Sequence, residues 1–93
     1  MELIILNGKK MTSKEVTHTY LKQKLSHPDY HGSNLDALFD VLSTYNKPIK
    51  IILINEEDLI KQLGDYGNSL LQVFHDSIKE NPNIKFETGQ LKK

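Results

Sequence analysis

The 93-residue chain contains neither cysteine nor arginine. Without cysteine it has no disulfide framework, no thiolate zinc site and no cysteine nucleophile, and it is compatible with a reducing compartment. All twelve cationic side chains are lysines. Lysine lacks the bidentate fork with which arginine holds phosphate or carboxylate, so the composition disfavours an anion-recognition site.

Long apolar runs are also missing. The purest run, residues 51–54, is far too short to cross a bilayer, and the apolar start at residues 3–6 is too short for a signal peptide, so we expect neither membrane insertion nor secretion. An apolar share of 38% and a charged share of 26% are typical of a water-soluble globular protein. At this length we expect one domain, residues 1–93, with one modest core.

The charge sums to zero, because twelve acids balance twelve lysines. A neutral chain is not a general nucleic-acid binder, which needs an excess of basic groups. The charges are nevertheless unevenly distributed: residues 1–24 contain five lysines and two acids, whereas residues 25–46 contain three aspartates and no lysine. Neutrality therefore conceals an acidic middle segment.

Apolar periodicity and turn signals predict the element order β-α-α-β-α-α-β. A Thr12–Glu15 capping box predicts the start of the first helix, and Ser33 or Asn34 should cap the second. Helical connections between strands imply an α/β fold, a three-stranded parallel sheet packed with about four helices. The expected strands are 2–6, 49–54 (buried on both faces) and 84–88, and the expected helices are 13–25, 35–44, 56–63 and 68–80.

The second predicted helix carries an acidic stripe. Asp36, Asp40 and Ser43 follow one another at helical spacing beside the apolar face, with Phe39 on the boundary between the two. Like charges four residues apart cost a helix a few tenths of a kcal/mol, and no lysine on this helix offsets them. The stripe is either an ordinary solvated face or a surface kept for a basic partner.

Two further residues extend this picture. The helical wheel places Asp76 of the fourth helix away from Leu70 and Phe74, so we expect it to be exposed. Tyr30, in the loop before the second helix, is by itself more typical of packing, although tyrosine is also enriched at interfaces. Together these residues would form an acidic surface with aromatic edges. The remaining inward positions predicted are Val16, Tyr20, Leu21 and Leu25 on the first helix, and Leu35, Leu38, Leu42 and Tyr45 on or after the second.

Residues 28–40, P-D-Y-H-G-S-N-L-D-A-L-F-D, resemble the signature of the barstar family, intracellular inhibitors of barnase-type ribonucleases. Only the usual tryptophan differs, replaced here by Phe39. Residues 71–76, L-Q-V-F-H-D, are similar to the family's fourth helix, with Asp76 in place of glutamate. Length and element order also agree, so the resemblance covers nearly the whole chain.

The resemblance implies a cytoplasmic inhibitor, monomeric when free, that plugs the basic active site of a ribonuclease and needs no cofactor or metal. It implies that Asp40 is the central anchor, standing in for a substrate phosphate. Ser43 is added because it continues the acidic stripe. The glycine that follows this position in a family member is replaced by Thr44, so the cognate ribonuclease stays open. The partner-binding residues expected are Tyr30, Asp36, Phe39, Asp40, Ser43 and Asp76.

The sequence allows two alternatives to a ribonuclease inhibitor. For an enzyme, His27, Asp29 and His31 suggest metal ligands, but Pro28 prevents the helical geometry that would aim both imidazoles at one ion. Acid–base hydrolysis of RNA by His31 and His75 would need cations to hold phosphate, and residues 25–46 have none. We therefore expect no enzymatic activity. The second alternative is an immunity-type protein that binds a different basic secreted toxin with the same surface, and the sequence leaves it open.

Overall fold

The computed structural model describes residues 2–27, 30 and 32–89. Three parallel strands form one sheet in the order β1-β2-β3. The register aligns Ile4 of β1, Ile51 of β2 and Phe86 of β3 across the sheet. The predicted α/β fold with a parallel sheet is confirmed. The strand bounds are β1 Glu2–Asn7, β2 Ile49–Ile54 and β3 Ile84–Gly89.

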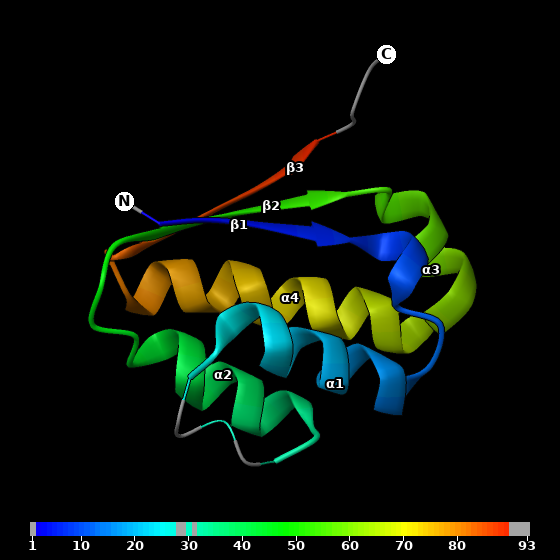
Figure 1. The fold of residues 1–93 in the computed structure, drawn as a ribbon, viewed down its shortest axis with the longest axis horizontal. Coiled ribbons are helices and arrows are strands. Elements are labelled where there is room, and N and C mark those ends of the chain that lie inside the picture. Colours follow the sequence, from blue (N-terminus) through cyan, green and yellow to red (C-terminus); the bar gives the residue numbers. More distant parts are fainter. Residues whose placement is uncertain (1, 28–29, 31, 90–93) are drawn as a thin grey trace.

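The helices are a short 3₁₀ turn η1 (Gly8–Lys10) and four α-helices, α1 (Lys14–Leu25), α2 (Leu35–Ser43), α3 (Glu56–Leu63) and α4 (Asp65–Glu80). Figure 1 shows α1, α2 and α4 on the same side of the sheet, with α3 at the end where β1 and β2 finish. α4 packs against both β3 and α2, so it lies between the sheet and the second helix. Among the described residues, no helix has both the length and the apolar character needed to cross a membrane.

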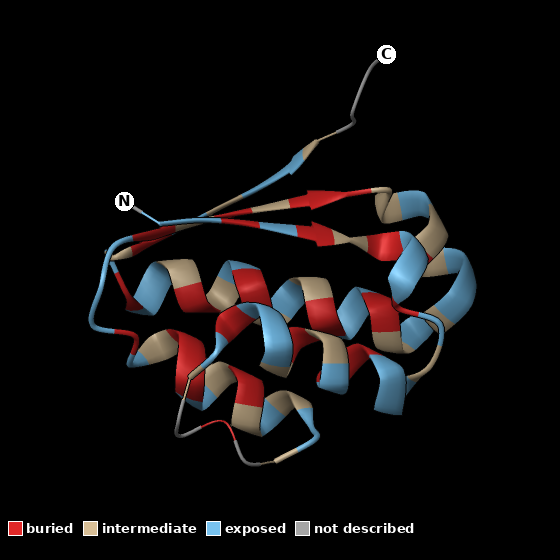
Figure 2. Cartoon of the chain, in the orientation of Figure 1, coloured by how far each residue is buried: buried red, intermediate tan, exposed pale blue. Residues whose placement is uncertain are grey.

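Helices cover only one face of the sheet. In β1, Ile4 and Leu6 point inward and are buried, whereas Leu3 and Ile5 are 56% and 42% exposed. The open face also includes the half-buried Ile52 of β2, and Figure 2 shows exposed residues along β1 and β3. The expectation that the middle strand is buried on both faces therefore holds only in part, because the outward Lys50 and Ile52 are half-buried whereas the outward Ile54 is 7% exposed.

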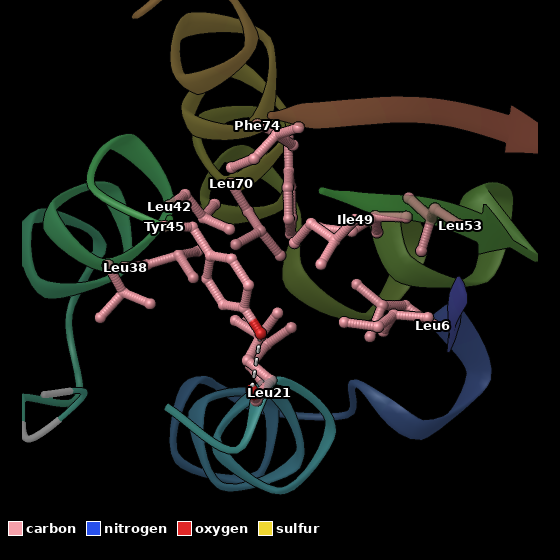
Figure 3. Packing of buried hydrophobic residues seen from close by; sticks show 14 of the residues in the cluster. Leu6, Leu21, Leu38, Leu42, Tyr45, Ile49, Leu53, Leu70 and Phe74 are labelled. Carbon is pink, nitrogen blue, oxygen red and sulfur yellow. Dashed lines mark hydrogen bonds between the residues drawn. The ribbon is translucent and has the colours of Figure 1, made fainter. Parts of the chain in front are cut away.

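The core lies between the sheet and the helices. Figure 3 shows Leu6, Ile49 and Leu53 of the sheet facing Leu21 of α1 and the inner side of α4. Leucine, isoleucine and phenylalanine side chains that are no more than 1% exposed form its centre, and each contributes about 1.5–3 kcal/mol by leaving water. Around α2, Figure 3 shows Leu38 and Leu42 of the helix, Tyr45 just after it, and Leu70 and Phe74 of α4.

Several predicted boundaries and caps differ in the structure. The N-cap of α1 is Ser13, whose Oγ accepts from Val16 N at 3.1 Å, so the Thr12–Glu15 capping box is not formed. α4 begins at Asp65, three residues earlier than expected, directly after Gly64 ends α3. Asn55 occupies the N-cap position of α3 but makes no capping bond, since its Nδ2 donates to Asn7 Oδ1 at 2.9 Å.

The buried face of α1 also differs from the prediction. Val16 is 45% exposed and Tyr20 is only half-buried, whereas Leu21 and Leu25 are buried as expected. Thr17 and His18 occupy the remaining buried positions and are both 0% exposed. A polar side chain on the inward face of this helix was not foreseen from its apolar pattern.

Candidate functional site

The acidic stripe of α2 is open to solvent. Asp36 and Asp40 are exposed, one turn apart, on a helix whose N-cap Asn34 accepts from Ala37 N at 2.8 Å. Within residues 2–27, 30 and 32–89, no hydrogen bond or ion pair reaches either carboxylate, and the ion pair found there joins Lys50 to Glu87 on the sheet. The first-turn position favours Asp36 through the helix dipole, but Asp40 lies beyond its reach. The two charges therefore repel each other without local compensation.

The opposite side of α2 fixes the direction in which these acids point. Leu38, Val41 and Leu42 are buried, and α2 packs against α4. Val41 is buried although it is not among the predicted inward positions. Phe39 is half-buried, so part of its ring lies at the surface beside the acids.

The C-terminal end of α2 is held by polar contacts. Asn81, which follows α4 and is 5% exposed, donates from Nδ2 to the backbone oxygens of Leu42 and Tyr45, each at 2.8 Å. Its side chain thereby adds a donor to a carbonyl in the last turn of α2 and to a second carbonyl just after the helix. Asn81 was not identified from the sequence, where it was only a helix-stop signal before Pro82.

Ser43 and its neighbour are tied to the backbone of the stripe. Ser43 Oγ donates to the carbonyl oxygen of Asp40 at 3.3 Å, and Thr44 Oγ1 donates to the same oxygen at 2.6 Å. Ser43 is half-buried. Both hydroxyls can still accept a hydrogen bond from a partner, because a hydroxyl oxygen has two lone pairs.

Asp76 lies on α4, the helix packed against α2. Its Oδ1 accepts from Gln72 Nε2 at 2.9 Å, and the residue is half-buried. The prediction that Asp76 is exposed is wrong, because the helical wheel does not account for neighbouring side chains. The amide of Gln72 holds this carboxylate along its own helix.

Tyr30 is a core residue. It is 5% exposed, and its hydroxyl lies 2.8 Å from His18 Nδ1. The second imidazole nitrogen, Nε2, lies 2.6 Å from the hydroxyl of Tyr66 in the first turn of α4. Burial, followed by the charge of Tyr66, raises the pKa of Tyr30 above its ordinary value of 10.0. The packing interpretation of Tyr30 agrees with its burial, while a direct role in binding stays a prediction.

His18 was missed by the sequence reasoning. A signal was present, since His18 lies three and seven residues before Leu21 and Leu25 and so shares their buried face. Burial, followed by the charge of Lys22, lowers the pKa of His18 below 6.5. The ring is therefore neutral near pH 7, with one nitrogen donating and the other accepting.

No metal site is found in the part of the chain that the structure describes, where no three His, Asp or Glu side chains come close enough to hold an ion. The metal site suggested by the sequence involves Asp29 and His31. These two residues and Pro28 lie outside the described residues. What the described site offers is a fixed helix face with two unpaired carboxylates and one aromatic edge.

Comparison with known proteins identifies the family. The family model described as Barstar (barnase inhibitor) matches residues 1–88. A Bacillus subtilis (strain 168) protein named "Putative ribonuclease inhibitor YrdF" is 40% identical over 81 residues, which are 86% of this chain and 89% of that protein. Since the match extends from the first strand into the last, the chain belongs to the barstar family.

Proposed function

We propose that the protein inhibits a barnase-type ribonuclease by placing the acidic face of α2 in the basic groove that otherwise holds RNA phosphates. The observation that carries the proposal is the pair of exposed carboxylates, Asp36 and Asp40, that have no cationic partner in the described residues. A cation brought by a partner would relieve their mutual repulsion and form charge-assisted hydrogen bonds. As the resemblance implies, the inhibitor would act in the cytoplasm.

The proposed contacts divide by chemistry. Asp40 is the anchor, because it lies on the exposed side of α2 beyond the helix dipole and depends most on an external cation. Asp36 adds a second charge, and Phe39 supplies an apolar edge that excludes water around the charges. Ser43 and Asp76 would contribute polar contacts at the margin, and the buried Tyr30 would act mainly by shaping the chain before α2.

The same residues account for binding without catalysis. Hydrolysis of RNA needs cations that stabilise charge on phosphate during reaction, and residues 32–46 carry none. A carboxylate face instead repels RNA and competes with it for a basic groove. The surface is thus suited to blocking a ribonuclease rather than to replacing one.

The test is inhibition of barnase, the ribonuclease named in the family's description, in a fluorescent RNA cleavage assay. Asp40→Ala should weaken inhibition by about 2 kcal/mol or more, the loss typical of an interface hot spot. Its unfolding free energy should stay within about 0.5 kcal/mol of the wild type, because the carboxylate has no partner within the described residues to lose. Glu57→Ala, which removes an exposed acid from α3, is the control and should leave dissociation unchanged.

Salt gives an independent check. The association rate should fall steeply as ionic strength rises, because opposite charges steer the encounter and salt screens them. Equal inhibition by Asp40→Ala and wild type would remove Asp40 from the interface. If the wild type does not inhibit barnase, and the immobilised chain captures a basic protein without ribonuclease activity, the second candidate, an immunity-type protein for another toxin, would replace the proposal.

A further inference from the structure

A buried imidazole connects three segments that are distant in the chain. His18 of α1 is 0% exposed and lies between the hydroxyls of Tyr30, at 2.8 Å, and Tyr66, at 2.6 Å. Both tyrosine rings meet the imidazole edge to face, with centroids 6.4 Å and 6.0 Å away. The bridge therefore joins the chain just before α2 to α1 and to the first turn of α4.

The bridge is complete only when the imidazole is neutral. A neutral ring donates from one nitrogen and accepts at the other, so one tyrosine accepts from it and the other donates to it. Among the described residues, no buried side-chain nitrogen or oxygen lacks a partner. For the hydroxyl of Tyr30, the structure gives no partner other than His18 in the described part of the chain.

We propose that His18 is a positioning residue: its neutral ring holds Tyr30, and with it the chain that enters α2, and protonation of the ring releases this hold. The inhibitory surface is then fully formed only above the pH at which His18 gains a proton. The consequence for inhibition rests on the function proposed above, whereas the conformational change does not.

Protonation disrupts the bridge for two reasons. An imidazolium donates from both ring nitrogens and accepts at neither. The tyrosine hydroxyl that donated a hydrogen bond to the neutral ring therefore loses its acceptor. The ring would also become a buried cation, which is costly without a paired carboxylate. Burial, followed by Lys22, already lowers the pKa of His18.

The charged groups around the bridge do not offset that cost. Lys14 Nζ lies 4.8 Å from the ring centroid of Tyr66, and Lys22 Nζ lies 5.7 Å from that of Tyr30. Burial, followed by the charge of the Glu15 carboxylate, raises the pKa of Tyr66. In the described residues, the groups that face the bridge from α1, α4 and the chain before α2 thus include two cations and one carboxylate.

A second contact places the same segment against α1. Lys22 Nζ donates to Ser33 Oγ at 3.2 Å, one residue before the N-cap of α2. Loosening Tyr30 should therefore be felt at the first amides of α2. The Leu38 amide is a suitable reporter, since it donates to Asn34 O at 3.2 Å.

The experiment measures hydrogen-exchange protection of the Leu38 amide by NMR from pH 8 downward, through the titration of the His18 ring as followed by its own resonances. The Thr17 amide is the internal control, because it donates to the N-cap oxygen of α1, Ser13 O, at 2.9 Å. In the wild type, the protection of Leu38 relative to Thr17 should fall about fivefold or more as the His18 ring titrates, which corresponds to the loss of one buried hydrogen bond. In His18→Gln the ratio of Leu38 to Thr17 protection should stay constant, because the side-chain amide of glutamine can donate and accept hydrogen bonds but does not titrate.

Two outcomes would overturn the positioning role. One is an equal fall of the Leu38 ratio in His18→Gln and wild type, and the other is a constant wild-type ratio while His18 titrates. If His18→Gln does not fold, Tyr66→Phe decides instead, since it cuts the link to α4 and should lower the Leu38 ratio already at pH 8. A ratio equal to that of the wild type in Tyr66→Phe would refute the bridge.

The link to inhibition is tested by the pH dependence of dissociation from barnase. Dissociation of the wild-type complex should accelerate more on acidification than that of the His18→Gln complex, because only the wild type loses the bridge at low pH. Titrations of barnase itself affect both complexes equally and cancel in this comparison. Parallel pH profiles would refute the link. A wild type that inhibits barnase at no pH would contradict the proposed function, and the amide measurement would still decide the role of His18.

Discussion

Asn81 should be a major determinant of how α2 is held, and Asn81→Ala tests this directly. Its buried side chain makes three hydrogen bonds, donating to Leu42 O and Tyr45 O at 2.8 Å each and accepting from Asn83 N at 3.0 Å. Tyr45 O keeps a second donor, Asn83 Nδ2 at 3.2 Å. Leu42 O likewise keeps the Tyr45 amide as a donor at 3.4 Å. With about 0.5–1.5 kcal/mol for each bond and both carbonyls still satisfied, the substitution should cost about 1.5–3 kcal/mol of unfolding free energy.

The assay is urea unfolding followed by far-ultraviolet circular dichroism. For an m-value of about 1–3 kcal/mol per M, the midpoint should fall by roughly 0.5–3 M with an unchanged slope. Asn46→Ala is the matched control, because Asn46 is exposed in the connection between α2 and β2 and should change stability by no more than about 0.5 kcal/mol. Asn81→Asp should be at least as damaging as Asn81→Ala, since a carboxylate oxygen would face two carbonyls. Equal midpoints for Asn81→Ala and Asn46→Ala would refute the reasoning.

Two further predictions concern the scaffold. Gly8→Ala should lower the unfolding free energy by about 1–3 kcal/mol, because the added Cβ overlaps the carbonyl oxygen of Asn55. The control Gly89→Ala should be tolerated, because its Cβ would lie 3.7 Å from the Ile52 side chain. Similar melting temperatures for both variants would contradict this. Burial raises the pKa of Tyr30 in the folded state, so its stabilising effect is present below pH 10 and should be lost as pH rises above that value. Alkaline unfolding curves should therefore be flatter for Tyr30→Phe than for the wild type, and parallel curves would contradict the assignment.

Much of the architecture could be predicted because the local signals were strong. The β-branched run at 49–54 and the apolar period of the second helix encode their elements without help from distant contacts. The cap at Asn34 is confirmed by its bond to Ala37 N. Gly64 ends α3 with a positive φ of 59°, a conformation in which glycine has no side-chain penalty. Exposure of Asp36 and Asp40 followed from the same helical wheel and is also confirmed.

The failures share a physical cause, because each depended on contacts between elements. The pattern could not show that helices cover one face of the sheet, and so it buried the middle strand on both sides. It could not show that Val41 is buried together with Leu38 and Leu42. It also treated Asp76 as an isolated position on a wheel, although Gln72 and the packing around α4 leave it half-buried.

The sequence by itself determined the element order, the family signature and the lysine-free acidic stripe, since these depend on residue type and short spacing. Only the tertiary structure decided which residues hold α2 and the chain before it in place. His18, Tyr30 and Tyr66 meet because α1, α4 and the chain before α2 converge, and Asn81 reaches α2 from the far end of α4. Such contacts join residues up to 48 positions apart, and their hydrogen bonds form only once the surrounding core has excluded water.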